Sequence, residues 1–305
     1  MTYYQIEQRC INVFLKKGPF RHLCTPGKLT EIICENEDDY RFCVSMIAIA
    51  AVVANVRIIT FEIMSNHIHV VLSGTDDDCK RFFDYFKDKL KRYFTKTGRY
   101  KNLDGFEPTL IPVDSLDSLR NEIVYTSRNA YMATGAYTPF SYPWGGGNLF
   151  FNTFAEKVPA KKYKTLTYRE KRAVCHGAGL ELPDNYEVDD KGMIMPRCFC
   201  DYHFGESLFH DARHYFNMVS KNFEAYSEVA RRLGDSIILT DDELFAAVVQ
   251  ISKAKYGETR PTMLPVKDKI DVARQIRRDY NASEGQIQRM LRLNRSDVSQ
   301  LFGHS

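Results

Sequence analysis

The pattern of apolar and polar residues in the first half of the chain predicts a small antiparallel sheet with helices. Short apolar runs bounded by turn residues are typical of strands, and longer segments with apolar residues at helical spacing are typical of helices. The predicted strands cover residues 20–24, 56–63, 67–72 and 106–113, and the predicted helices cover 40–54, 75–98 and 116–134. Their order favours an α+β fold, an antiparallel sheet with helices on one face.

Helical spacing dominates the second half of the chain. Helices are predicted over residues 206–233 and 241–256, and three short helices over 267–279, 283–291 and 296–302. The spacing of the last three resembles a helix-turn-helix, with 296–302 as the recognition helix. We therefore expect a mostly α-helical C-terminal region, and three parts overall: a first domain over 1–152, a helical insertion or linker over 153–262, and a helix-turn-helix-like module over 263–305.

Composition narrows the class of protein without deciding its function. The chain has 305 residues, of which 44% are hydrophobic, enough for a sizeable core. No apolar run approaches the roughly 18 residues that a membrane helix needs, and the first residues lack the apolar core of a signal peptide. We expect a cytoplasmic protein without a membrane partner, in which the eight scattered cysteines are reduced. A net charge of +3 is too small to indicate nucleic-acid binding by itself.

The segment with the most specific chemistry is His67-Ile68-His69. Side chains alternate along a strand, so both imidazoles lie on one face while Ile68 points to the other. Two adjacent imidazoles on a rigid strand form a pair of metal ligands. The alternative is that both are ordinary surface or packed histidines.

The segments around this pair resemble the single-tyrosine HUH transposases and their REP-associated relatives. Residues 64–69 resemble the Met-Pro-Asn-His-Val-His block of that family, with Ser65 in place of Pro. Tyr125 and Asn129, four apart and so on one helical face, match the Tyr-Ile-His-x-Asn-Pro helix, although Ala130 replaces its Pro. Residues 141–145 resemble the Tyr-Pro-Trp-Ser segment, and the three landmarks occur in the family's order.

The resemblance implies the fold of an HUH nuclease, a ferredoxin-like or RRM-like sandwich, and a catalytic role for Tyr125. His67, His69 and Asn129 would bind Mg²⁺ or Mn²⁺, with Mn²⁺ the better partner for imidazole. Tyr125 would attack a single DNA strand and form a 5′-phosphotyrosine, so that the protein acts as a transposase on hairpin-flanked elements. Two alternatives stay open: a hairpin-DNA-binding regulator that has lost its chemistry, and a metal-dependent nucleic-acid hydrolase without a covalent intermediate.

The C-terminal module is the expected duplex or hairpin DNA contact. Residues 267–302 carry eight Lys or Arg and five Asp or Glu, an excess equal to the +3 of the whole chain. Arg289, Arg292 and Arg295 are candidate phosphate contacts, and Ser299 and Gln300 are candidate base contacts. The alternative is a small helical bundle that packs on the middle of the chain. The sequence leaves open whether the protein is a monomer or a homodimer.

Overall fold

The computed structural model describes residues 2–27, 31–134, 138–177, 179, 181–221, 229–230, 232–233, 239, 241–294 and 297–298. The chain divides into two compact units, Met1–Asn222 and Phe223–Ser305. The boundaries expected after residues 152 and 262 fall inside these units. No helix in the described ranges is both long and apolar enough to cross a membrane.

The first unit is built around a four-stranded antiparallel sheet. Its elements follow the chain as α1 (Tyr3–Leu15), β1 (Phe20–Cys24), α2 (Glu37–Ala54), β2 (Arg57–Ile63), β3 (Ile68–Ser73), α3 (Asp76–Lys96), β4 (Thr109–Val113) and α4 (Leu116–Thr134). The strand order is β2-β3-β1-β4, and every neighbouring pair is antiparallel. From β1 to β4 this is the β-α-β-β-α-β order of a ferredoxin-like sandwich. The α+β prediction is confirmed.

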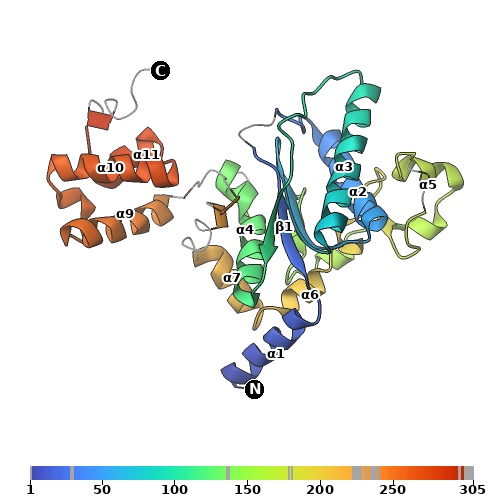
Figure 1. The fold of residues 1–305 in the computed structure, drawn as a ribbon, viewed down its shortest axis with the longest axis horizontal. Coiled ribbons are helices and arrows are strands. Elements are labelled where there is room, and N and C mark those ends of the chain that lie inside the picture. Colours follow the sequence, from blue (N-terminus) through green and yellow to red (C-terminus); the bar gives the residue numbers. More distant parts are fainter. Residues whose placement is uncertain are drawn as a thin grey trace. The chain divides into compact units, whose positions relative to one another are not determined.

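Helices cover both faces of this sheet. In Figure 1, α2 and α3 lie on one side of β1, and α4 with α7 (Ala212–Lys221) lies on the other. We expected helices on one face only, whereas α4 covers the second face. The reason is that the inner strand β3 and its neighbour β2 are both buried along almost their whole length, so both faces of the sheet need a cover.

The two faces differ in chemistry. Residues at successive strand positions point to opposite faces, so Leu23 and Val70 belong to the α2–α3 face and join aromatic side chains of α3 such as Phe82 and Phe86 in the core. The α4 face instead carries His22 and other buried polar side chains of β2 and β3. The apolar face stabilises the fold, and the polar face is where chemistry is expected.

Local signals in the sequence fix where the main helices begin. The Thr75 hydroxyl accepts a hydrogen bond from the Asp78 backbone, and the Asp78 carboxylate accepts one from the Thr75 backbone, which is a capping box at the start of α3. The Asn36 side chain caps α2 in the simpler way, by accepting from Asp39 N–H. The strands β2 and β3, both predicted from the sequence, form a hairpin, since they pair across the turn at Ser65.

The rest of the first unit packs against this sandwich. It contains a small antiparallel pair, β5 (Lys161–Lys162) and β6 (Glu187–Val188), and the helices α5 (Tyr168–Val174), α6 (Tyr202–Ser207) and α7. Short 3-10 turns occur at Gly147–Leu149, Ala155–Lys157, Tyr163–Thr165 and Pro196–Cys198. Cys200 forms an isolated bridge to Ile58 of the edge strand, and the Tyr215 hydroxyl of α7 donates to the Ser127 hydroxyl of α4 at 3.2 Å. Residues 153–221 therefore belong to the first unit.

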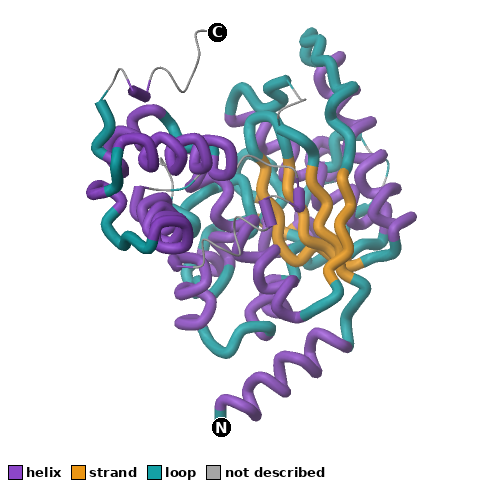
Figure 2. The backbone as a smooth tube through the Cα atoms, turned by 60° about the vertical axis from the view of Figure 1, so that its left-hand side comes forward, coloured by secondary structure: helices purple, strands orange, loops and turns teal. Residues whose placement is uncertain are grey.

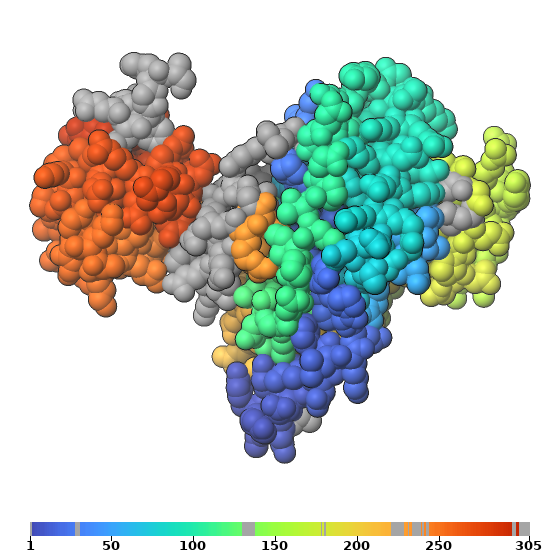
Figure 3. Space-filling model, viewed as in Figure 1, coloured from blue at the N-terminus to red at the C-terminus, as the bar shows by residue number. Residues whose placement is uncertain are grey.

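The first helix, α1, was not predicted. It protrudes from the first unit, as Figures 1 and 3 show, and leaves Tyr3 and Tyr4 exposed. Its attachment is both polar and apolar: the Glu7 carboxylate accepts two hydrogen bonds from the Arg120 guanidinium of α4 at 2.9 and 3.0 Å, and the Phe14 ring stacks on Phe20. Cys10 is the one buried residue of this helix, so α1 lacks the broad apolar face by which the sequence pattern reveals a helix.

The second unit is helical, as predicted. It contains α9 (Asp241–Tyr256), a 3-10 turn at Pro261–Met263, α10 (Val266–Tyr280) and α11 (Glu284–Leu291). These three α-helices are labelled in Figure 1, and Figure 2 draws the helices in purple. Ser283 caps α11 through a capping box with Gln286. Of the third predicted short helix, only Asp297 and Val298 lie within the described residues, and Val298 is buried.

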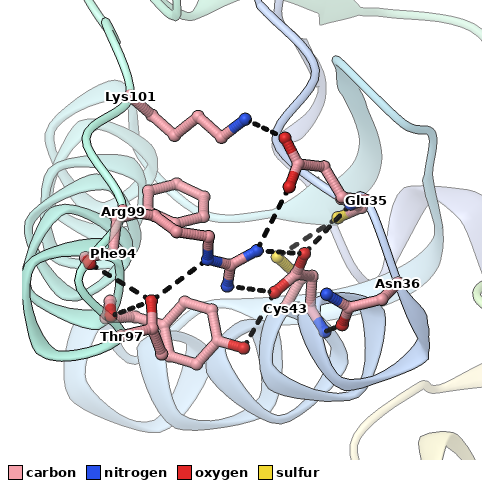
Figure 4. Close-up of polar contacts among 10 residues, drawn as sticks. Glu35, Asn36, Cys43, Phe94, Thr97, Arg99 and Lys101 are labelled. Carbon is pink, nitrogen blue, oxygen red and sulfur yellow. Dashed lines mark hydrogen bonds and ion pairs between the residues drawn. The ribbon is translucent and has the colours of Figure 1, made fainter.

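A buried ion pair stabilises the junction of α2 and α3 (Figure 4). Asp39, only 1% exposed, accepts hydrogen bonds from both terminal nitrogens of Arg99 at 2.6 and 2.8 Å and from the Tyr93 hydroxyl at 2.8 Å. Burial by itself raises the pKa of the Asp39 carboxyl, but hydrogen bonds from Arg99, the Glu35 backbone and Tyr93 outweigh it and leave the pKa below its ordinary value. The ionised carboxylate is therefore the stable form in the folded protein.

We expect Asp39→Asn to lower the free energy of unfolding at pH 7 by about 3 kcal/mol, because it removes the buried carboxylate that accepts from Arg99 and Tyr93 and leaves Arg99 only the longer, more exposed ion pair with Glu35 at 3.6 Å. A carboxyl whose folded pKa is depressed stabilises the fold above its unfolded value and loses that contribution as the pH falls through the folded value. The difference between variant and parent should therefore shrink below about pH 4. Urea unfolding at pH 7 and pH 3, followed by the fluorescence of Trp144 in the first unit, measures both effects. Equal stabilities at pH 7 would contradict this account.

Candidate functional site

Three elements bring the predicted chemistry together on the α4 face of the sheet. In the strand register, His69 of β3 lies opposite Cys24 of β1 on one side and opposite Glu62 of β2 on the other. Directly opposite residues of antiparallel strands point to the same face, and so do residues two apart, such as His22 and Cys24. The helix α4 lies over these side chains and supplies residues from its second, third and fourth turns.

A continuous line of short contacts runs through this site. The Glu122 Oε2 atom lies 2.6 Å from His22 Nδ1, and His22 Nε2 lies 3.1 Å from His69 Nδ1. On the other side of the ring, His69 Nε2 lies 2.9 Å from Asn129 Nδ2, which also contacts the Tyr125 hydroxyl oxygen at 3.4 Å. Helical geometry explains the spacing on α4, because residues three and four apart share a face.

All five of these residues are buried. Glu122, His22 and His69 are 0% exposed, Tyr125 is 1% and Asn129 is 7%. Buried polar side chains are costly unless they are hydrogen-bonded, and five in one line are unusual in a core that serves packing alone. Polar contacts between these side chains, and not the burial of apolar ones, therefore determine how the site is arranged.

His67 lies at the outer end of the site and is half-buried. Its Nδ1 atom is 2.8 Å from Asn66 Oδ1, and the Asn66 amide donates to the Gly27 carbonyl at 2.6 Å. The space beside it is tight, since a Cβ atom on Gly27 would come within 2.8 Å of the His67 Nδ1 atom. The rings of His67 and His69 are perpendicular, with centroids 5.1 Å apart. The two imidazoles thus lie side by side, as the sequence pattern predicted.

These side chains fit a divalent cation. An imidazole nitrogen binds such an ion at about 2.1 Å, which places the centroids of two rings on one ion roughly 4.5 to 5.5 Å apart. Two adjacent ligand atoms of an octahedral ion lie about 3 Å apart, and the Asn129 amide is 2.9 Å from His69 Nε2. If the Asn129 side-chain amide turns by half a rotation, its oxygen takes the place of its nitrogen beside His69 Nε2.

The protein alone does not complete a coordination shell here. Among the residues that the structure describes, no three His, Cys, Asp or Glu side chains are grouped so that they could hold a metal ion. A cation bound by His67, His69 and the Asn129 oxygen would take its other ligands from water or from a bound molecule. This is the usual situation for Mg²⁺, which keeps waters and binds substrate phosphates.

The electrostatics of the site favour a neutral His69. Burial lowers its pKa well below the ordinary value, and the neighbouring rings of His67 and His22 lower it further. A neutral imidazole has one nitrogen lone pair, which is the form that binds metals. His69 is therefore ready to bind a cation at neutral pH without first losing a proton.

Tyr125 is enclosed by its neighbours. Its ring packs edge-on against those of His69 and His22, with centroids 5.4 and 6.0 Å apart. With 1% of the residue exposed, a polymer can reach its hydroxyl only after neighbouring groups move aside. The position agrees with the sequence prediction that Tyr125, Asn129 and the histidines come together, and the burial is a feature that the sequence did not predict.

The third landmark of the sequence, residues 141–145, lies along the edge strand β2. The Tyr142 hydroxyl donates to the Ile63 carbonyl at 2.6 Å, and the Trp144 ring stacks on Tyr40 with centroids 5.2 Å apart. Gly145 allows the close approach of the two backbones, since a Cβ atom there would lie 2.9 Å from the Phe61 carbonyl oxygen. Residues 141–145 therefore pack against β2, and they are not part of the line of polar contacts.

Sequence reasoning missed His22 and Glu122. The signals were present, because His22 interrupts the apolar pattern of its strand and Glu122 precedes Tyr125 by three residues on the same helical face. Neither signal stands out without the tertiary structure, since single polar residues in strands and helices are common.

The predicted DNA contacts of the C-terminal module lie in the second unit. Arg289 forms an ion pair with Asp241 at 2.7 Å, and Arg292 ends α11 in the left-handed conformation with φ of 48°. Arg295, Ser299 and Gln300 lie outside the described residues. The structure therefore brings the candidate metal ligands and the candidate nucleophile together and leaves the DNA-contact prediction untested.

Comparison with known proteins gives no match. No protein-family model, no curated protein and no solved structure is significantly similar to this chain.

Proposed function

We propose that this protein is a metal-dependent endonuclease and strand transferase for single-stranded DNA, a transposase of the single-tyrosine HUH type. The observation that supports the proposal most is the contact of Asn129 with both His69 Nε2 and the Tyr125 hydroxyl, at 2.9 and 3.4 Å. Candidate metal ligands and a candidate nucleophile thus lie side by side on one face of the sheet. The resemblance of the three sequence landmarks to this family supplies the substrate class, single-stranded or hairpin DNA.

In the proposed reaction, the Tyr125 hydroxyl oxygen bonds to phosphorus and the bond from phosphorus to the 3′ oxygen breaks. The phenol proton leaves Tyr125 and the departing 3′ oxygen gains a proton, so the products are a 5′-phosphotyrosine and a free 3′-OH. A 3′-OH of another strand can reverse the step and join DNA without ATP. A bound Mg²⁺ or Mn²⁺ would supply positive charge near the scissile phosphate.

The residues of the chain have separate roles in this proposal. His67, His69 and Asn129 would hold the cation, and the Asn129 amide nitrogen lies 3.4 Å from the Tyr125 hydroxyl oxygen. An ordinary phenol has a pKa near 10 and is a weak nucleophile at neutral pH, so its proton must be lost as the new bond forms. The dry surroundings of Tyr125 would strengthen every electrostatic interaction made during that step.

The burial of Tyr125 favours a second candidate, a regulator that binds hairpin DNA without cleaving it. A tyrosine with 1% exposure is also what an apolar core residue would show. In that case the polar residues around it would stabilise the fold, and the second unit would supply the DNA contacts.

The test is incubation with labelled single-stranded hairpin oligonucleotides and Mn²⁺, followed by a denaturing gel and peptide mass spectrometry. We expect a covalent adduct on Tyr125 that requires Mn²⁺ and disappears with EDTA. Hairpin binding without any adduct would favour the regulator. Cleavage without an adduct would favour a hydrolase that uses His67 and His69 alone.

A further inference from the structure

The line from Glu122 to Asn129 has a direction that follows from donor and acceptor chemistry. A carboxylate only accepts, so the 2.6 Å contact from Glu122 Oε2 to His22 Nδ1 requires the proton on Nδ1. If the His22 ring carries only this proton, its Nε2 atom is unprotonated. The 3.1 Å contact to His69 Nδ1 is a hydrogen bond only if His69 carries its own proton on Nδ1.

The other end of the line agrees with this direction. His69 with its proton on Nδ1 has a lone pair on Nε2, and the group 2.9 Å from that nitrogen is the Asn129 amide nitrogen, a donor. If His22 were instead to donate through Nε2, His69 would carry its proton on Nε2, and the Asn129 amide would have to turn and present its oxygen to that proton. With the amide as it lies in the structure, the contacts at the two ends of the line fit the same tautomer of His69, and the Glu122 carboxylate is the group in the line that cannot reverse its role.

We propose that Glu122 and His22 are positioning residues that hold His69 in the tautomer with its Nε2 lone pair facing Asn129 and the cation. The inference rests on the proposed function, because the lone pair matters most if a metal binds there. It adds two residues to the site that act through His69 and do not touch the DNA. A carboxylate that orients a metal-binding histidine is a known arrangement, and here a second imidazole lies between the two.

The position of Glu122 explains why a carboxylate is needed. The group is 0% exposed and lies on α4 one turn before Tyr125, so no water competes for the His22 proton. A neutral amide at this place could either accept from His22 Nδ1 or donate to it, and both directions of the line would then be satisfied. Only an acceptor without protons fixes one direction.

The variant that tests this is Glu122→Gln, which keeps the size of the side chain. The first measurement is the ring nitrogen spectrum of the full chain labelled with ¹⁵N-histidine, without metal, in which His69 is assigned by comparison with a His69→Gln variant. In the parent protein we expect the His69 Nε2 signal to be that of an unprotonated ring nitrogen. In Glu122→Gln this signal should move toward the average of the signals of the two tautomers. An unchanged His69 signal would overturn the proposal.

The second measurement is the dissociation constant for Mn²⁺, the metal alone, by calorimetry. We expect Glu122→Gln to weaken binding by about 10- to 100-fold, the usual effect of losing a residue that orients a metal ligand. The matched control is Asp39→Asn, which also neutralises a buried carboxylate but lies in the α2–α3 junction. It should leave Mn²⁺ affinity and the His69 signal unchanged although it destabilises the fold.

The two measurements separate this inference from the proposed function. If the parent protein binds no Mn²⁺ but Glu122→Gln still moves the His69 signal, the positioning role stands and the metal-dependent function falls. If Mn²⁺ binds equally to parent and variant, the function survives and the positioning role is wrong. Should Glu122→Gln not fold, His22→Gln interrupts the same line one residue further on and should give the same two changes.

Discussion

Replacing Tyr125 by phenylalanine is expected to abolish the covalent DNA adduct and to leave hairpin binding intact. The substitution removes one oxygen atom, and the ring keeps its packing against His22 and His69. The lost atom is the one that would attack phosphorus, and removing a nucleophile lowers the rate of such enzymes by about 10⁴-fold or more. Denaturing gels with labelled hairpins measure the adduct, and gel-shift titration measures binding.

The control for this prediction is Tyr163→Phe. Tyr163 is also 1% exposed, and its hydroxyl contacts the Cys175 sulfur at 3.5 Å, away from the line of polar contacts. It should keep full adduct formation. If Tyr125→Phe cleaves DNA as fast as the parent protein, the tyrosine mechanism is wrong and the hydrolase without a covalent intermediate becomes the better explanation.

His67→Ala is expected to weaken Mn²⁺ binding by about 100-fold or more, because it removes a candidate metal ligand itself and not only a residue that orients one. His67 is half-buried and lies directly before β3, so the variant should fold normally. Adduct formation should fall to the level that the parent protein shows in EDTA. Calorimetry with Mn²⁺ and the hairpin cleavage assay provide the two measurements.

His69→Ala should give the same loss of Mn²⁺ together with a loss of stability. The His69 ring is 0% exposed and holds contacts on both sides, to His22 and to Asn129. Its removal leaves a cavity and two polar groups without their partner, at a cost of about 2 to 4 kcal/mol in the free energy of unfolding.

The matched control for both histidine variants is His203→Ala, because the His203 side chain is 67% exposed and lies on α6. It should change neither Mn²⁺ affinity nor stability. An unchanged Mn²⁺ affinity in both His67→Ala and His69→Ala would remove the proposed metal site, and with it the metal-dependent function.

The burial of Tyr125 adds a requirement that any catalytic account must meet. DNA has to reach a hydroxyl on a residue that is 1% exposed, so the side chains over it must be displaced when DNA binds. The line of polar contacts holds these side chains in place until DNA binds. An adduct on Tyr125 in the hairpin assay would show that this displacement occurs.

The sequence by itself determined the strands and helices of the sandwich. Apolar runs and caps, such as the pair Thr75 and Asp78, act over a few residues, so local patterns suffice to predict β2, β3, α3 and α4. The alternation of strand side chains also placed His67 and His69 on one face, and helical spacing placed Tyr125 with Asn129. What these patterns could not give was α1, whose contacts include hydrogen bonds between Glu7 and Arg120, residues 113 positions apart.

Only the tertiary structure decided which residues complete the site. His22 and His69 are 47 positions apart and His22 and Glu122 are 100 apart, and no local pattern relates them. They meet because β1 pairs with β3 in one register and because α4 covers the second face of the sheet, where we expected no helix. Strand register and helix placement are set by the packing of the whole unit. Local sequence therefore supplied the chemical groups, and long-range packing brought them into contact.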